Sequence, residues 1–415
     1  MTLTDTTVET DPLITALQPP ESAEAIIANA HAILPIIAEE ADGIEELARL
    51  TPRAERAMRA AGVFQMAFPA SRGGVEMSLV QQVEVTALIA AVDASAGWNV
   101  GVLNATGFYA GRLGDEAYAE LYPTRDMPTS GAFHPRGRAE RVEGGYLVSG
   151  DWGWGSGSYS AEHIIGGAEV FENGEPIIGP AGTQLHLGFW LPREAIDIKH
   201  DWQVLGVRGS GSTSYSIPAP GAFVPERYTF DREPLDDPQA DPLNKSVGIS
   251  HVALTGVVLG VARHAVQLAG DFVRLRMVGP SAAKIDAAAK QALGEAMSEV
   301  DFAYAGVREV CRLTDEVIFT PGLGLTPLQR TRMTSANAAA ANAMRRALSL
   351  CMEVASATYI LDRNPIQRVI RDGFAALAHA GTRRAHLGST AGAALENPEL
   401  GYTVADDPRW NEALA

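Results

Sequence analysis

Hydrophobic residues recur at helical spacing through the first third of the chain, and this pattern predicts several packed helices. One apolar stripe runs from Ile26 through Ile36 to Ile44, and a second runs from Val83 to Val92. Glycines that favour loops follow Pro69 and Asp93. We therefore expect an N-terminal helical domain over residues 21–128, preceded by a flexible N-terminus at residues 1–20.

The pattern changes near residue 129 to short alternating runs that are separated by glycine and proline. Three of these runs occupy residues 143–151, 163–171 and 184–192. Short strands at such regular spacing are typical of a small antiparallel sheet or barrel. The sequence predicts this β domain over residues 129–230, and a linker rich in proline and aspartate at residues 231–245.

Helical periodicity returns after the linker in four long segments rich in alanine and leucine. Prolines separate the segments, which cover residues 251–262, 284–314, 328–357 and 366–394. Four such segments predict a four-helix bundle over residues 246–400, followed by a tail at residues 401–415. The expected fold class is therefore mainly α with a central β domain.

Composition excludes several classes of function. The 33 basic and 50 acidic residues give a net charge of −17, which disfavours nucleic acid and anionic membrane surfaces as partners. The longest uncharged stretch, residues 94–111, contains four glycines and is too polar to span a membrane. No basic and apolar leader opens the chain, and only two cysteines occur. We expect a cytoplasmic enzyme with no membrane association.

The familiar local signatures of nucleotide and nucleophile sites are missing. There is no G-x-G-x-x-G between a strand and a helix, no phosphate-binding G-x-x-x-x-G-K-S/T motif and no G-x-S-x-G elbow. His379 and His386 lie two helical turns apart, but no cysteine or carboxylate accompanies them. We therefore expect no metal site.

Three ordered stretches carry the strongest functional signal. Residues 133–139 and 144–157 contain P-x-G-x-A, G-G-Y-x-V-x-G and W-x-W-x-S-G; residues 202–212 contain G-V-R-G-S-G-S, with Phe-Val-Pro at 223–225; residues 365–372 read P-I-Q-R-V-I-R-D, with His379 seven residues later. In order and spacing, these stretches resemble the acyl-CoA dehydrogenase superfamily. Within that superfamily they look like the two-component flavin-dependent monooxygenases.

The resemblance implies a fold, a cofactor and a reaction. The family has a helical domain, a β domain and a C-terminal four-helix bundle, and its members assemble as homotetramers. The monooxygenases bind diffusible reduced FMN or FAD that a separate flavin reductase supplies. They form a flavin hydroperoxide with O₂ and hydroxylate a small aromatic or heteroaromatic substrate.

Several residues are expected at the flavin. Trp154 and Ser156 alternate two apart on a predicted strand, so an indole and a hydroxyl can meet one flat ligand. Arg208, Ser210 and Ser212 lie in a glycine-rich loop whose N–H groups, hydroxyls and guanidinium suit a phosphate. The resemblance adds two more residues to the flavin site, Gly157 and Arg276.

The reaction type depends on which acid–base residue is present. Dehydrogenases of the superfamily need a carboxylate base, but the usual Tyr-Glu-Gly-Thr run reads His379-Ala-Gly-Thr here, and residues 250–256 hold no acid either. The resemblance implies that His379 takes the catalytic role together with Ser156, because an imidazole can stabilise the intermediate or accept a substrate proton. An acyl thioester dehydrogenase or oxidase with a displaced base is the alternative. A catalytically silent binding subunit is a further one.

An aromatic cluster is the predicted substrate pocket. Many phenol-hydroxylating relatives have a second histidine two turns after the residue that corresponds to Trp98, whereas this chain has Asn104 and Thr106 there. A neutral heteroaromatic, an amine or a sulfur compound is therefore a candidate substrate. The expected pocket residues are Trp98, Asn104, Phe108 and Tyr109.

Overall fold

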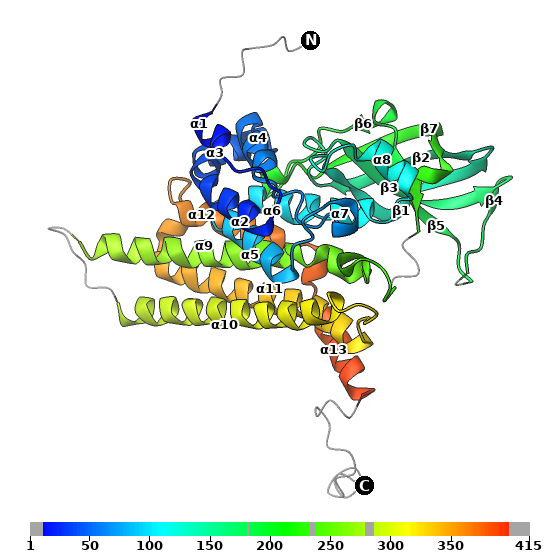
Figure 1. The fold of residues 1–415 in the computed structure, drawn as a ribbon. Coiled ribbons are helices and arrows are strands. Elements are labelled where there is room, and N and C mark those ends of the chain that lie inside the picture. The colour runs from blue at the N-terminus through cyan, green and yellow to red at the C-terminus, as the bar shows by residue number, and fades with distance from the viewer. Residues whose placement is uncertain (1–10, 181, 232–236, 279–285, 398–415) are drawn as a thin grey trace, which may run out of the picture.

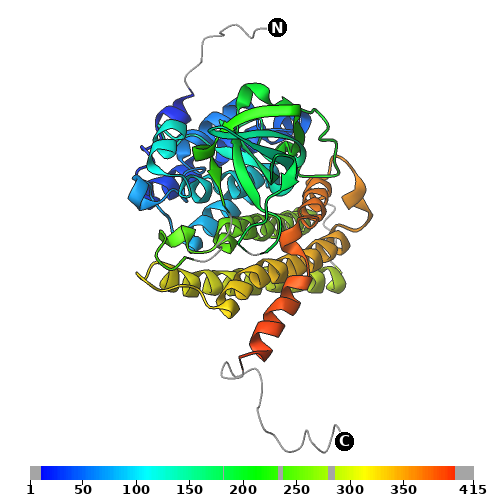
Figure 2. The same cartoon turned by 90° about the vertical axis from the view of Figure 1, so that its right-hand side faces the viewer.

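The computed structural model describes residues 11–180, 182–231, 237–278 and 286–397. The N-terminal helices and the β domain lie side by side, and both rest on a layer of long C-terminal helices (Figures 1 and 2). This is the mainly α fold with a central β domain that the sequence predicts.

The N-terminal helices bury the predicted apolar stripes. Ile26, Ile36 and Ile44 are fully buried in one cluster. Side-chain caps start several of the helices, and Ser78 and Gln81 form a reciprocal capping box at α5. The helices are α1 (Pro12–Thr15), α2 (Ala23–Ala32), α3 (Leu34–Leu47), α4 (Pro52–Ala61), α5 (Leu79–Ala90), α6 (Ala94–Leu103), α7 (Thr106–Ala110) and α8 (Asp115–Leu121).

The start of the chain is more ordered than expected from residue 11 onward. Asp11 caps α1 and forms an ion pair with Arg53 at 2.7 Å. The Asn29 side chain both donates to and accepts from the backbone of Gln18. Residues 11–20 are therefore held against α2 and α4, because side chains of those helices satisfy their polar groups. The expected flexibility of residues 1–10 concerns a segment outside the described residues.

The β domain is one mixed sheet in the order β6-β7-β2-β1-β3-β5-β8, with β4 paired to β3. The antiparallel prediction is wrong for one central pair, since β1 and β3 run parallel. The chain makes a β1–β2 hairpin and then crosses to the other edge of β1 before it starts β3. The strands are β1 (Thr129–Val142), β2 (Gly145–Gly155), β3 (His163–Glu172), β4 (Glu175–Pro176), β5 (His186–Leu191), β6 (Asp197–Ile198), β7 (Thr213–Pro225) and β8 (Thr229–Phe230).

Three long helices and two shorter ones make up the described residues of the C-terminal part. The fourth predicted segment is not one helix, because a 3-10 turn at Ala380–Thr382 divides it into α12 and α13. Residues 401–415, the predicted tail, lie outside the described residues. The helices are α9 (Ala253–Arg276), α10 (Ala287–Ile318), α11 (Pro327–Ala355), α12 (Pro365–Ala376) and α13 (Ala385–Leu395).

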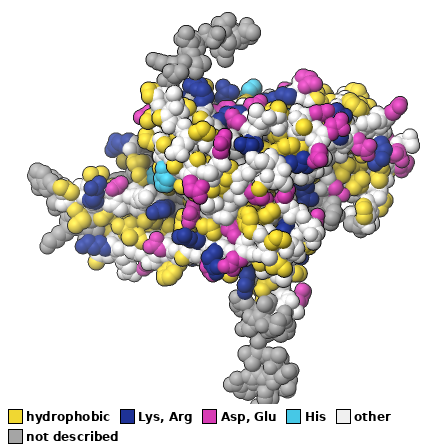
Figure 3. Space-filling view, viewed as in Figure 1, with side chains coloured by type: hydrophobic (Ala, Val, Ile, Leu, Met, Phe, Trp, Pro, Cys, Tyr) yellow, Lys and Arg dark blue, Asp and Glu magenta, His cyan; other side chains and the backbone are white. Residues whose placement is uncertain are grey.

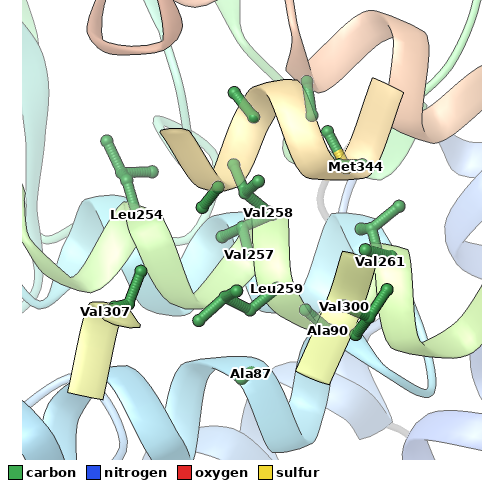
Figure 4. Close-up of a cluster of buried hydrophobic side chains, with 14 of the residues drawn as sticks. Ala87, Ala90, Leu254, Val257, Val258, Leu259, Val261, Val300, Val307 and Met344 are labelled. Carbon is green, nitrogen blue, oxygen red and sulfur yellow. The ribbon is translucent and has the colours of Figure 1, made fainter. Parts of the chain in front are cut away.

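Helix α9 is the centre of the main core. Its apolar side chains pack against α5, α10 and α11, and Val257 and Val261 are fully buried (Figure 4). Residues 247–276 are long and apolar enough to cross a membrane, but 72% of the apolar window in this segment is buried in the fold. The apolar character of α9 is therefore explained by its place in the core.

The described part of the predicted linker, residues 237–245, is bound to the segment that follows α10. Lys245 is buried and donates from Nζ to the carbonyl oxygens of Thr320 and Leu323, each at 2.8 Å. Those carbonyls belong to the segment that follows the end of α10. The linker thus fastens the β domain to the long helices.

Candidate functional site

A cavity of about 740 Å³ lies between the β domain and the C-terminal helices. Its β side includes Phe133 and Trp154, and its helical side includes Val252, Met333 and Asn337. His379 and the following two residues also line it. Three predicted site residues therefore reach this cavity: Tyr109, Trp154 and His379.

His379 stands at the break between α12 and α13. Its Nδ1 accepts a hydrogen bond of 3.1 Å from the backbone N–H of Gly381, so the ring caps the short 3-10 turn. Burial lowers the pKa of His379, which favours the neutral ring. Because Nδ1 is an acceptor, the proton of the neutral imidazole is on Nε2. His379 therefore offers the cavity a hydrogen-bond donor.

A chain of side-chain contacts connects His379 to three serines. The Trp98 ring packs edge-on against His379 with centroids 5.6 Å apart, and its Nε1 donates to Ser156 Oγ at 3.1 Å. Ser156 Oγ lies 2.6 Å from Ser212 Oγ, which lies 2.8 Å from Ser210 Oγ. The tertiary fold thus joins residues from four distant segments, and all three serines are buried.

Trp154 and Ser156 do not share a strand face, contrary to the sequence prediction. Trp154 has a φ of +66°, and the N–H of Ser156 bonds back to the Trp154 carbonyl at 2.8 Å. This turn breaks the alternation of β2, so the residue Trp154 is 72% exposed while Ser156 is buried. A bulky residue in the left-handed region is strained, and such strain clusters at ligand sites.

Gly157 has a structural reason to be glycine. Its φ is +74°, and a Cβ at this position would lie 2.9 Å from the Leu103 side chain. Its N–H bonds to the carbonyl of Ser210 at 2.8 Å. Gly157 therefore fastens the end of β2 to the serine loop, residues 207–212.

The serine loop does not form the open phosphate cradle that the sequence predicts. The N–H of Gly209 donates to Ser95 Oγ, and a Cβ on Gly209 would clash with Ile44 at 2.1 Å. The N–H groups of Ser210 and Gly211 close turns within the loop. Arg208 lies 3.9 Å from Glu45. These backbone donors are already satisfied, because the glycines serve close packing against α3 and α6.

A buried ionic network holds the serine loop in place. Asp372 Oδ1 accepts from the N–H of Val207 at 2.7 Å, and Arg368 forms an ion pair with Asp93 at 2.7 Å and lies 3.8 Å from Asp372. Asp93 also caps α6, the helix that carries Trp98. Burial, together with the nearby Asp93 carboxylate, raises the pKa of Asp372 to about 7. The network fixes the three segments that supply Trp98, Ser212 and His379.

None of the other predicted residues lines the cavity. Trp98, Ser156 and Ser212 are connected to it only through the contact of the Trp98 ring with His379, and the following three have no part in that chain of contacts. Asn104 is buried and donates to Gln82, and Phe108 is buried under Arg112. Arg276 ends α9, about 30 Å along the helix from the cavity residue Thr255. Within one chain, these three residues lie outside the site.

Sequence reasoning missed several residues of the site. Asp372 belongs to the Arg-Asp motif at 371–372, which was a usable signal, but no role was assigned to it. Met333 and Asn337 carried no local signal, because a mid-helix methionine or asparagine is ordinary. Only the approach of α11 to the 3-10 turn makes them cavity residues.

The cavity fits a flat flavin ring. Trp154 is 72% exposed and lines the cavity wall, so its indole offers an apolar surface on which a flat ring can pack. The volume is ample for an aromatic ligand, and His379 supplies a donor at its edge. Over the described residues, no group of three or more His, Cys, Asp or Glu side chains could hold a metal ion.

Comparisons with known proteins identify the class. The sequence model of the protein family described as acyl-CoA dehydrogenase, C-terminal domain, matches residues 252–384. The crystal structure of the HsaA monooxygenase from Mycobacterium tuberculosis superimposes with a TM-score of 0.80 at 25% identity, covering 92% of this chain and all of that one. The chain therefore has the acyl-CoA dehydrogenase fold.

Two curated relatives define the branch. The oxygenase subunit HsaA of a flavin-dependent monooxygenase from Mycobacterium tuberculosis is 27% identical over 92% of this chain and 94% of its own length. Indole-3-acetate monooxygenase from Pseudomonas putida is 30% identical over 78% and 82%, respectively. The chain belongs to the flavin-dependent monooxygenases of the acyl-CoA dehydrogenase superfamily. This confirms the predicted oxidoreductase class and disfavours the acyl thioester and silent-subunit alternatives.

Proposed function

We propose that the chain is the oxygenase component that hydroxylates a small aromatic or heteroaromatic molecule in the 740 Å³ cavity, with reduced FMN or FAD from a separate flavin reductase. The observation that carries the proposal is the cluster of His379, Trp98 and Ser156 beside a cavity with an open tryptophan wall. When bound, the reduced flavin would supply the electrons that activate O₂. A cytoplasmic location fits this exchange of diffusible flavin.

His379 lines the cavity and is the reacting end of the proposed site, and Ser156 supports it through Trp98. The neutral imidazole holds a proton at Nε2 and can donate it to an oxygen atom that gains charge. With Nδ1 engaged by Gly381, neither ring nitrogen is free to accept a substrate proton. Between its two possible roles, the geometry therefore favours stabilisation by donation.

Trp154 is proposed to contact the flavin, and the serine loop to hold the turn that carries it. The exposed indole would cover one face of the ring, and Gly157, Ser210 and Ser212 hold the neighbouring turn rigid. Arg208 and Arg276 are the candidate phosphate contacts. Arg276 is exposed at the end of α9 and does not line the cavity of its own chain. It would therefore contact a phosphate only at a different site.

The assay combines the purified chain with a flavin reductase, NADH, flavin and O₂, and detects hydroxylated products of indole and phenol by mass spectrometry. We expect product only when every component is present. Anaerobic dye reduction by an acyl-CoA without any reductase would instead support a dehydrogenase.

A homotetramer is proposed to form through the C-terminal helices. Hydrophobic side chains lie exposed over the long helices (Figure 3). Leu275 in α9 and Met297 and Phe302 in α10 are exposed. Phe302 is 79% exposed beside a groove between α10 and α11. Exposed apolar clusters of this kind are typical of subunit contacts.

A further inference from the structure

The wall of the cavity carries positive charge, although the chain as a whole is acidic. Arg136 and three histidines, His134, His379 and His386, line the cavity, and none of the described residues around it is an aspartate or glutamate. The whole chain, in contrast, has 50 acidic and 33 basic residues. A concave wall with a cation and no carboxylate concentrates positive potential, and this potential attracts anions.

Arg136 lies where strand β1 leaves its neighbour β2. The β1–β2 ladder ends at the pair Gly137–Gly150, while β2 continues along β7. On its other edge β1 pairs with β3, and the register of that pair shifts on both sides of Pro135. Irregularities of this kind re-aim side chains and are frequent beside ligand sites. The two strands thus separate at the cavity, with Arg136 at the point of separation.

A glycine on β3 makes room for this irregular segment of β1. A Cβ at Gly167 would lie 2.0 Å from the carbonyl oxygen of Phe133, so any other residue would push the strands apart. The Gly167 carbonyl oxygen accepts a hydrogen bond of 2.7 Å from Trp152 Nε1, which fixes this point of β3. On the opposing segment, His134 and Arg136 are exposed and both line the cavity. The sheet therefore presents an imidazole and a guanidinium to a ligand that enters from solvent.

The guanidinium of Arg136 has no carboxylate partner among the described residues. Two other arginines of the same strand differ in this respect, because Arg138 pairs with Glu140 at 2.8 Å and Arg141 lies 3.7 Å from Glu172. A cation that lines a cavity without a counter-ion is available to an anionic ligand.

Asp151 is the first residue of β2 beyond the β1 ladder, but it does not neutralise Arg136. It does not line the cavity, and in the described structure it forms no ion pair with Arg136. The charge of Asp151 acts on Lys199 instead, where Asp197 first and Asp151 to a smaller extent raise the pKa of the ammonium group. The charge of Arg136 is therefore left for a ligand.

One guanidinium beside an imidazole suits a carboxylate better than a phosphate. The parallel N–H donors of a guanidinium match the two oxygens of a carboxylate, and its single charge balances a monoanion. A phosphate monoester carries a charge of about −1.5 to −2. The segment has no N–H at Pro135 to compensate the excess. Elsewhere the wall contains Phe133, Trp154 and Val252, which suit an aromatic ring.

We propose that Arg136 is a specificity residue that binds the carboxylate of an aromatic acid, with His134 beside the same anion. The proposal rests on the monooxygenase function described above and narrows its substrate class to small aromatic molecules that carry a carboxylate. Arg136 selects and orients the substrate, whereas His379 acts at the reacting position.

Two probe pairs test this by calorimetric titration of the flavin-free protein: indole-3-acetate against indole-3-acetamide, and 4-hydroxyphenylacetate against 4-hydroxyphenylacetamide. In each pair the amide keeps the ring and the shape but removes the charge. We expect the wild type to bind at least one acid about tenfold more tightly than its amide, because a charge-assisted bidentate contact is lost.

Variants of the two neighbouring arginines separate the anion site from general charge. Arg136→Gln should lose the preference for the acid, and Arg136→Lys should retain part of it, because lysine keeps the charge but not the planar fork. Arg138→Gln is the matched control. It removes the same charge two residues away on the same strand, outside the cavity, and should keep the wild-type preference.

The proposal is overturned if the wild type prefers neither acid over its amide, or if Arg136→Gln keeps the preference. Anaerobic titration with reduced FMN and reduced riboflavin separates the substrate from the cofactor. We expect the ratio of the two flavin affinities to be equal in the wild type and Arg136→Gln. A fall of this ratio with an unchanged acid preference would assign Arg136 to the flavin phosphate and overturn the proposal.

The outcome is independent of the hydroxylase assay, because the titrations of the acids need neither flavin, reductase nor O₂. An acid preference that depends on Arg136 but is accompanied by no hydroxylated product would refute the proposed reaction and leave the anion site intact. Hydroxylation without any acid preference would do the reverse.

Discussion

His379 is held as a donor by a single backbone contact. The N–H of Gly381 occupies Nδ1, and burial lowers the pKa of the ring. The residue therefore stays neutral across the range in which a free histidine begins to titrate. Its chemical role follows from this tautomer rather than from its residue type alone.

Replacing His379 should uncouple the reaction. His379→Ala is expected to lower the product formed per reduced flavin about 100-fold and to raise H₂O₂ release, because the donor at Nε2 is lost. Product and peroxide are measured together. His386→Gln, a change at the same cavity, is the control and should keep most of the coupling.

The pH profile should report the same group. Because the pKa of folded His379 lies below its usual value of 6.5, the neutral form persists as the pH falls from about 8 to 6.5. We expect constant coupling over this range and a decline only at lower pH, where the ring gains a proton. A decline that begins above pH 7 and persists in Asp372→Asn, which removes the carboxyl with a pKa of about 7, would contradict this assignment.

Ser156 and Ser158 are neighbouring buried serines with different environments. Ser156 Oγ bonds Trp98 and Ser212, whereas Ser158 Oγ has no partner in the described structure. Ser156→Ala should lower coupling at least tenfold by releasing the Trp98 ring. Ser158→Ala should leave coupling unchanged, and equal effects would show that the contact to Trp98 is unimportant.

At the scale of elements, α12 anchors the serine loop. Asp372 on α12 accepts a hydrogen bond from the N–H of Val207. In the same way, Asp315 on α10 accepts hydrogen bonds from the N–H groups of Leu79 and Val80 at the start of α5. Asp372 is buried, Asp315 is partly buried, and both accept hydrogen bonds from backbone N–H groups. Only the first one bears on the site, because only Val207 leads into the serines.

This pair of aspartates separates stability from positioning. Asp372→Ala and Asp315→Ala should each lower the free energy of unfolding by about 1–3 kcal/mol, because both leave backbone donors unsatisfied. Only Asp372→Ala should also raise the Kd of reduced flavin and lower coupling. Asp372→Asn keeps an acceptor for Val207 and should restore most of the coupling. Loss of coupling in Asp315→Ala would refute the distinction.

At the scale of the whole molecule, exposed apolar residues are unevenly placed. Phe302 lies on the long-helix layer, and Ile178, which is 61% exposed, lies on the β domain far along the chain. If the proposed tetramer forms through the long helices, another subunit buries Phe302 but not Ile178. Phe302→Glu should yield species smaller than the wild type in size-exclusion chromatography with light scattering. Ile178→Glu should elute as the wild type, and the opposite pattern would place the contact on the β domain.

The sequence was sufficient for the order of the domains and for the family. Helical stripes such as Ile26 to Ile44 and the strand runs near 143–151 and 163–171 depend on local periodicity, and the structure confirms them. The motif at 365–372 leads to His379, which the structure places at the cavity. These features are local, so the residue order alone expresses them.

Contacts between distant segments could only be found in the tertiary structure. The parallel pairing of β1 with β3, the left-handed turn at Trp154 and the satisfied N–H groups of the serine loop each depend on a neighbour far away in the chain. The burial that keeps His379 neutral and the Oδ1 of Asn337, which is unpaired within the described structure, likewise depend on contacts between distant segments. Burial and hydrogen-bond partners determine what these side chains can do, and packing alone supplies both.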